Sequence, residues 1–166
     1  MNGGYSPLQV ALHWIIVLMI PVQYLTGGSV ERTHHAVHMG MEPDRWDILQ
    51  HVVHNYCGMA IGFLMGVRLL VRLFGNFDAA ASKSTSAIAA RTLHLAFYAA
   101  IIGQACLGFV ASYVTFSVAP LHVAGSWVIL AMVFIHVLAA AWHTLVLKDD
   151  TIDRKARFRP KRTTEL

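Results

Sequence analysis

Four long apolar stretches constrain the fold of this 166-residue chain more than any other feature. They run approximately over residues 7–27, 49–73, 89–116 and 120–147. Each reaches the roughly 20 residues that a helix needs to cross about 30 Å of hydrocarbon. Only 13% of the residues are charged, about half the fraction usual in a soluble domain. The sequence therefore predicts an all-α integral membrane protein, a four-helix bundle.

The charges between the stretches predict how the chain is oriented. Lysine and arginine predominate in 68–91 and in 148–166, whereas 28–48 has four carboxylates against two arginines, a formal charge of −2. By the positive-inside rule, both termini are cytoplasmic and the acidic loop faces the periplasm. We expect a multi-pass protein of the bacterial inner membrane, with a four-span domain at 1–148 and a basic cytoplasmic tail at 149–166.

The ten histidines are concentrated in the apolar stretches, where an ionisable side chain is costly and is therefore a functional candidate. Those inside the stretches or at their ends are His13, His51, His54, His94, His122, His136 and His143. His122 and His136 are 14 residues apart, which places them on one side of a helix with a rise of about 21 Å between them. The spacing suits two stacked cofactors, and an apolar iron porphyrin with two axial imidazoles fits each position.

Helical rise predicts a partner for each of these ligands. His54 lies near the outer end of the second stretch, close to the level of His122. His13 lies about 9 Å inside the start of the first stretch. Its depth is nearer to that of His136 than to that of His143, but depth alone leaves both open. Because the chain has no C-x-x-C-H motif, any haem would be bound noncovalently.

Small residues accompany the candidate ligands. Gly58, Gly62 and Gly66 follow His54 at steps of four, and Gly125 follows His122 by three. Glycines in this pattern either let membrane helices approach closely or give a porphyrin a flat face beside its ligand. The sequence leaves both explanations open for the three-glycine strip, and it predicts that Gly125 clears space for the cofactor.

The chain resembles the bacterial cytochrome b561 family. The shared motifs are YSPLQVALHW in the first stretch, HNYCG and RLLVRL in the second, and two histidines separated by thirteen residues in the fourth. The resemblance covers residues 5–150 and extends to the diheme cytochrome b subunits of nickel–iron hydrogenases and formate dehydrogenases. It implies two b-type haems. It also implies that His54 and His122 bind the iron of the outer, periplasmic-side haem, and that His13 and His136 bind the iron of the inner haem.

Members of this family exchange electrons between a donor or partner and membrane quinone. The resemblance therefore implies a quinone-linked electron carrier or oxidoreductase that uses ubiquinone or menaquinone and meets a redox partner at the periplasmic face. One alternative is an anchor subunit of a dehydrogenase or hydrogenase. Another is a superoxide:quinone oxidoreductase, which the acidic loop 28–48 disfavours because superoxide is an anion. A divalent-metal transporter is remote, since no carboxylate lies well inside a stretch. Nothing indicates a nucleic-acid partner.

Further polar side chains are weaker candidates for contacts with haem propionates or quinone. They are His51, Arg68, Arg72, Arg91, His94 and His143. Each also has a simpler explanation, as a topology signal or as a helix-end residue among lipid headgroups. His34, His35 and His38 form a histidine-rich segment that either binds a metal ion or is a chance cluster in an exposed loop, and we favour the chance cluster.

Overall fold

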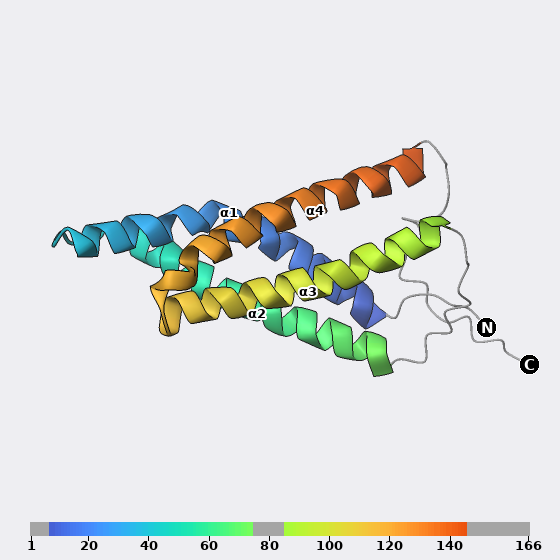
Figure 1. Ribbon diagram of the computed structural model, residues 1–166, viewed down its shortest axis with the longest axis horizontal. Coiled ribbons are helices and arrows are strands. Elements are labelled where there is room, and N and C mark those ends of the chain that lie inside the picture. The colour runs from blue at the N-terminus through green and yellow to red at the C-terminus, as the bar shows by residue number, and fades with distance from the viewer. Residues whose placement is uncertain (1–6, 75–84, 146–166) are drawn as a thin grey trace, which may run out of the picture.

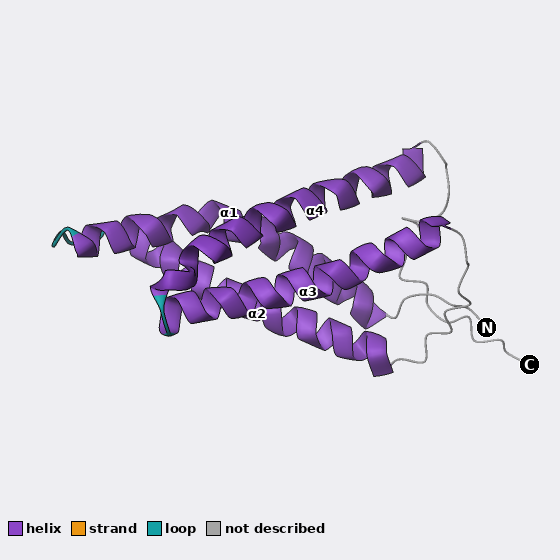
Figure 2. Ribbon diagram, viewed as in Figure 1, coloured by secondary structure: helices purple, strands orange, loops and turns teal. Residues whose placement is uncertain are grey.

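The computed structural model describes residues 7–74 and 85–145, which form four long helices and, within these ranges, no strand (Figures 1 and 2). The elements in chain order are α1 (Pro7–His38), α2 (Arg45–Phe74), α3 (Thr85–Tyr113), the short 3-10 helix η1 (Phe116–Val118) and α4 (Ala119–Leu145). The predicted all-α, four-helix architecture is confirmed. The predicted tail, 149–166, lies outside the described residues.

Large apolar side chains cover the outside of the helices. Leu18, Leu25 and Phe63, for example, are 72–80% exposed. An apolar surface of this extent would be unstable in water. All four helices are also long and apolar enough to cross a bilayer. Lipid chains therefore take the place of water around this bundle, as expected of a multi-pass membrane protein.

The acidic segment between the first two spans does not form a separate cap. Instead, α1 continues as a helix to His38, the chain turns at Gly40, and α2 begins at Arg45. Gly40 has a φ of 69°, a backbone conformation that glycine adopts at little cost. Arg32 and Asp47 join the two arms through an ion pair of 2.6 Å. The end of α1 is thus held against the start of α2 beyond the apolar stretches.

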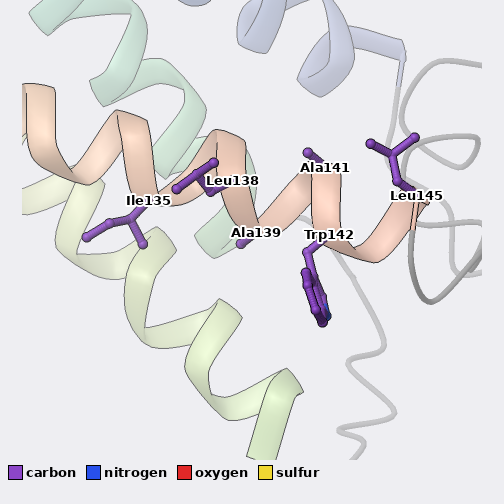
Figure 3. Close-up of a pocket in the computed structure, with 6 residues that line it drawn as sticks. All are labelled: Ile135, Leu138, Ala139, Ala141, Trp142 and Leu145. Atoms are coloured by element: carbon purple, nitrogen blue, oxygen red, sulfur yellow. The ribbon is translucent and has the colours of Figure 1, made fainter.

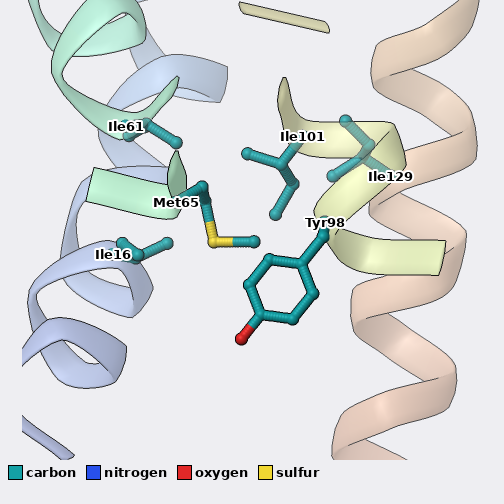
Figure 4. Close-up of a cluster of buried hydrophobic side chains, with 6 residues drawn as sticks. All are labelled: Ile16, Ile61, Met65, Tyr98, Ile101 and Ile129. Carbon is teal, nitrogen blue, oxygen red and sulfur yellow. The ribbon is translucent and has the colours of Figure 1, made fainter. Parts of the chain in front are cut away.

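A small apolar core lies at mid-height in the bundle (Figure 4). It is formed by Ile16 of α1, Ile61 and Met65 of α2, Tyr98 and Ile101 of α3, and Ile129 of α4. Ile129 is seven residues from both His122 and His136. The core therefore separates the two levels at which the histidines of α4 lie.

The helices run alternately up and down, and each packs mainly against the next one in the chain. They come together near η1 and spread apart toward the end where α4 finishes and α3 begins (Figure 1). Tyr24 joins the first and last helices, since its hydroxyl donates to the backbone carbonyl of Ser126 at 2.6 Å. The helices are consequently closer together at the η1 end of the bundle than at the opposite end (Figure 1).

Candidate functional site

The structure brings four of the predicted histidines together in two pairs at different heights in the bundle. His54 of α2 faces His122 of α4, with ring centroids 6.2 Å apart and ring planes at 84°. His13 of α1 faces His136 of α4, with centroids 6.4 Å apart and planes at 78°. We call these the outer pair and the inner pair. They are the pairs expected from the sequence, and their role as ligands remains a prediction.

The spacing within each pair fits a metal ion held between two imidazoles. A metal–nitrogen bond is about 2 Å long and a ring nitrogen lies about 1 Å from the centroid, so opposed imidazoles on one ion have centroids about 6 Å apart. Both measured separations agree with this value. The apolar bundle around them suits a porphyrin, whose macrocycle is itself apolar. The residues present therefore fit two bis-histidine haem sites.

His54 is held by the neighbouring helix α1. Its Nδ1 lies 3.2 Å from the backbone carbonyl oxygen of Gln23 and 3.4 Å from the hydroxyl of Thr26. The side-chain amide of Gln23 in turn donates to the backbone carbonyl of His54 at 3.0 Å. When Nδ1 donates its proton to a carbonyl, Nε2 is left unprotonated, which is the form of imidazole that binds a metal.

His122 is held in the same way by α3. Its Nδ1 lies 3.2 Å from the backbone carbonyl oxygen of Gln104, and the side-chain amide of Gln104 donates to the carbonyl of His122 at 2.7 Å. A glycine four residues after each glutamine makes room for the ring. A Cβ at Gly27 would lie 3.6 Å from Cε1 of His54, and one at Gly108 would lie 2.9 Å from Cε1 of His122.

Gln23 and Gln104 were not among the site residues predicted from the sequence. Their signal was present: each is an amide side chain inside an apolar span, followed by glycine in the segments QYLTG and QACLG. Polar groups in such spans are costly and usually have a partner. Only the packing of one helix on the next showed that the partner in both cases is a histidine.

The glycines near the ligands serve mainly helix contacts. A Cβ at Gly58 would lie 3.1 Å from Oε1 of Gln23, and one at Gly125 would collide with Oε1 of Gln104. Gly125 therefore makes room for the amide of Gln104, and its expected role beside a cofactor stays a prediction. Gly62 packs against Ala105 of α3, whereas a Cβ at Gly66 would meet nothing within 4 Å. For Gly58 and Gly62, helix packing is the explanation that the structure supports.

Charged and aromatic groups surround the inner pair. Nη1 of Arg68 lies 3.0 Å from Nδ1 of His13, so the guanidinium donates to that nitrogen. The ring of His136 also lies 5.8 Å from the ring of His94 and 5.5 Å from that of Phe97. Two of the weaker candidates, Arg68 and His94, thus belong to this site.

The remaining weaker candidates lie elsewhere. Arg72 stacks over the ring of Tyr98 at 5.8 Å, and Arg91 is exposed on α3. The side chain of His143 is outside the described part of the structure. His51 lies one turn before His54, and its ring centroid is 5.5 Å from that of His34.

The outer surface is formed by the end of α1, the start of α2 and η1. His34 stacks on Phe116 at 4.5 Å, while His35 and His38 are exposed. Within residues 7–74 and 85–145, no group of three or more histidine, cysteine or acidic side chains is placed to hold a metal ion. Arg32 donates hydrogen bonds to both carboxylate oxygens of Asp47, so these two charges offset each other.

A shallow apolar hollow of about 570 Å³ lies on α4 near its C-terminal end (Figure 3). It is lined by Ile135, Leu138, Ala139, Ala141, Trp142 and Leu145. All of these residues belong to one helix, and none is an acid, a base or a thiol. The hollow has no chemical groups of its own that would carry a reaction, and it is a surface that lipid chains can fill.

Known proteins resemble this chain along nearly its whole length. The sequence profile described as prokaryotic cytochrome b561 matches residues 4–154. The chain is 28% identical to cytochrome b562 of Cereibacter sphaeroides over 158 residues, which cover 94% of this chain and 97% of that protein. It is 25% identical to a Yersinia pestis protein named "probable superoxide oxidase CybB" over 186 residues, which cover 98% and 99%. No solved structure matches the chain.

Proposed function

The chain belongs to the prokaryotic cytochrome b561 family, and on this premise we propose that it carries electrons across the bacterial inner membrane through two b-type haems. Its membership of the family makes it a membrane cytochrome b with a role in electron transfer. The proposal adds the number of haems, their ligands and the partners. Ubiquinone or menaquinone exchanges electrons at one end, and a periplasmic or membrane partner does so at the other.

One observation carries this proposal: two facing histidine pairs have the ring separation that a metal ion between two imidazoles requires. When bound, haem iron gains and loses one electron at a time. His54 and His122 hold the outer haem, and His13 and His136 hold the inner one. Each haem would be held by two histidines and would supply one-electron redox chemistry at its site.

The bundle fixes the distance between the two sites. His122 and His136 are separated by about 21 Å of helical rise on α4, and porphyrin edges would be closer than the two iron positions. The core around Ile61, Met65 and Ile129 fills the space between the levels and excludes water. The chain therefore supplies a rigid, apolar path between two fixed sites.

The inner site has the groups that a quinone-linked cytochrome needs. Arg68 is placed to offset the charge of a haem propionate, since its guanidinium already reaches the ring of His13. His94 lies beside the ring of His136 and can donate a hydrogen bond to a propionate or a quinone oxygen.

We place both termini in the cytoplasm, so that the outer pair lies toward the periplasm. Segment 28–48 has a formal charge of −2, and its Arg32 is already paired with Asp47. Such a surface attracts cationic or neutral partners and repels small anions. Superoxide oxidation is the second candidate function, favoured by the name of the Yersinia pestis relative and opposed by this charge.

The test of the proposal is the haem content of the purified protein. We expect two noncovalent b-type haems per chain in a pyridine haemochrome assay, with low-spin spectra before and after reduction by dithionite. A content near zero would refute the cytochrome function. A content near one would remove one of the two proposed ligand pairs.

A further inference from the structure

We infer that Gln23 and Gln104 are positioning residues that fix the two axial imidazoles of the outer haem. This inference rests on the proposed function, because it takes His54 and His122 as ligands. Each glutamine forms a two-way hydrogen-bonded clamp with one histidine. Its backbone carbonyl accepts from the ring, and its side-chain amide donates to the histidine's own backbone.

Both clamps use carbonyl groups that already belong to helices. A carbonyl oxygen has two lone pairs, so it can accept a helical hydrogen bond and one more from a neighbouring helix. The second lone pair is often covered, because a helical side chain leans over the turn that precedes it. Glycines at Gly27, Gly58 and Gly108, each four residues after a clamp carbonyl, leave that position uncovered. Gly125, three residues after His122, leaves the backbone carbonyl of His122 uncovered in the same way.

The same unit is built twice from unrelated segments. In the α1–α2 hairpin it joins Gln23 to His54, and in the α3–α4 hairpin it joins Gln104 to His122. The ring-to-carbonyl distance is 3.2 Å in both. Two hairpins that share no long sequence motif thus present their histidines from opposite sides with the same contacts. A single clamp could be incidental packing, but a matched pair on the two ligands of one site indicates a shared role.

The clamps would act on the outer site in two ways. The hydrogen bond from Nδ1 sets the tautomer, directs Nε2 toward the opposite ring and makes the imidazole a stronger electron donor. The amide bond ties the helix of each histidine to its neighbour and so limits rotation of the ring. The two ring planes are thereby held near perpendicular, at 84°.

The angle between axial imidazole planes has its own spectroscopic signature. Perpendicular planes on low-spin ferric haem give a highly anisotropic EPR signal, and rotation toward parallel planes gives a rhombic one. A residue that affects folding alone would change the amount of haem without changing this signal. EPR therefore separates positioning from general stability.

We would test the inference with Gln23→Met and Gln104→Met in the intact haem-loaded protein. Methionine keeps the length and volume of glutamine but cannot donate to the histidine carbonyl. The variants keep the backbone carbonyl that accepts from the ring and lose only the amide bond that limits ring rotation. We therefore expect two haems per chain and an outer signal shifted from the highly anisotropic toward the rhombic type. The inner signal should not change, and the double variant should show the larger shift. The signals are assigned with His122→Ala, which should retain only the inner haem.

Gln9→Met is the matched control, because Gln9 is also a buried glutamine of α1 but lies one turn before His13, near the inner pair. It should leave the outer signal unchanged. Gly108→Ala tests the ring directly, since the added Cβ would press on His122 at 2.9 Å, whereas Gly27→Ala meets His54 at an ordinary 3.6 Å. We expect Gly108→Ala alone to shift the outer signal.

The outcomes separate this inference from the proposed function. Two haems per chain with a shifted outer EPR signal in both glutamine variants, and an unshifted one in Gln9→Met, would support the inference. An outer EPR signal like that of the wild type in both variants would overturn it. Equal loss of both haems from these variants and from Gln9→Met would also overturn it. If the wild-type protein holds no outer haem, the proposed function itself fails.

Discussion

The outer and inner histidine pairs have nearly equal ring separations, 6.2 and 6.4 Å, but very different surroundings. Uncharged glutamines and backbone carbonyls hold the outer rings where the helices come together. An arginine and two further rings meet the inner pair where the helices spread apart (Figure 1). Nearly equal spacing is thus found in two different chemical environments, one uncharged and one with a guanidinium.

The contrast extends to the protonation of the rings. A guanidinium has only donors, so while Arg68 donates to Nδ1 of His13, the proton of the neutral ring must be on Nε2. That is the opposite of the arrangement at His54 and His122, where Nδ1 donates and Nε2 is free. The two pairs thus differ in the groups that contact Nδ1: backbone carbonyls at His54 and His122, and a guanidinium at His13.

The largest effect that can test this comparison is the loss of a ligand. We expect His54→Ala or His122→Ala to remove the outer haem, and His13→Ala or His136→Ala to remove the inner one. Each change lowers the pyridine haemochrome value from two haems per chain to one, because a single imidazole holds haem weakly. His143→Ala should retain both haems.

The ligand assignment has a clear point of failure. If His143→Ala removed a haem while His136→Ala retained two, the inner site would be wrongly assigned. If the same haem signal disappeared in His13→Ala and in His54→Ala, the division into two separate pairs would be wrong.

An intermediate effect is expected from Arg68→Gln. Removing a positive charge near the inner site stabilises the ferric form there and lowers the inner midpoint potential, by on the order of 1 kcal/mol of redox free energy. The outer potential should stay constant in a potentiometric titration followed by absorbance. Arg91→Gln is the matched control, because Arg91 is an exposed arginine of α3. Equal shifts in both variants would show that Arg68 acts only through the overall charge of the cytoplasmic side.

The smallest effect concerns the outer surface. Asp47→Asn removes the carboxylate that pairs with Arg32, so the charge of 28–48 changes from −2 to −1. We expect slow reduction of the wild-type protein by superoxide and a rise of only a few-fold in the variant, since exposed charges are screened by salt. Stopped-flow measurements at several ionic strengths test this. Near diffusion-limited reduction of the wild type that slows as salt rises would mean that the surface attracts superoxide.

The sequence was ambiguous at particular places. The segment 28–48 was expected to be a loop, and much of it continues α1 as a helix to His38. Gly125 was expected to clear space beside His122, and the amide of Gln104 lies there. In both cases the local pattern was compatible with several structures, and contacts with a neighbouring helix selected one of them.

The sequence by itself determined the features that depend on a single helix. Four spans follow from the lengths of the apolar stretches, and the common side of His122 and His136 follows from 3.6 residues per turn. The contacts between helices were decided only by the tertiary structure: the two glutamine clamps, the arginine on His13 and the use of each glycine. The reason is physical. Helical periodicity is local, whereas the rotation and crossing of one helix on another arise from many weak contacts made at the same time.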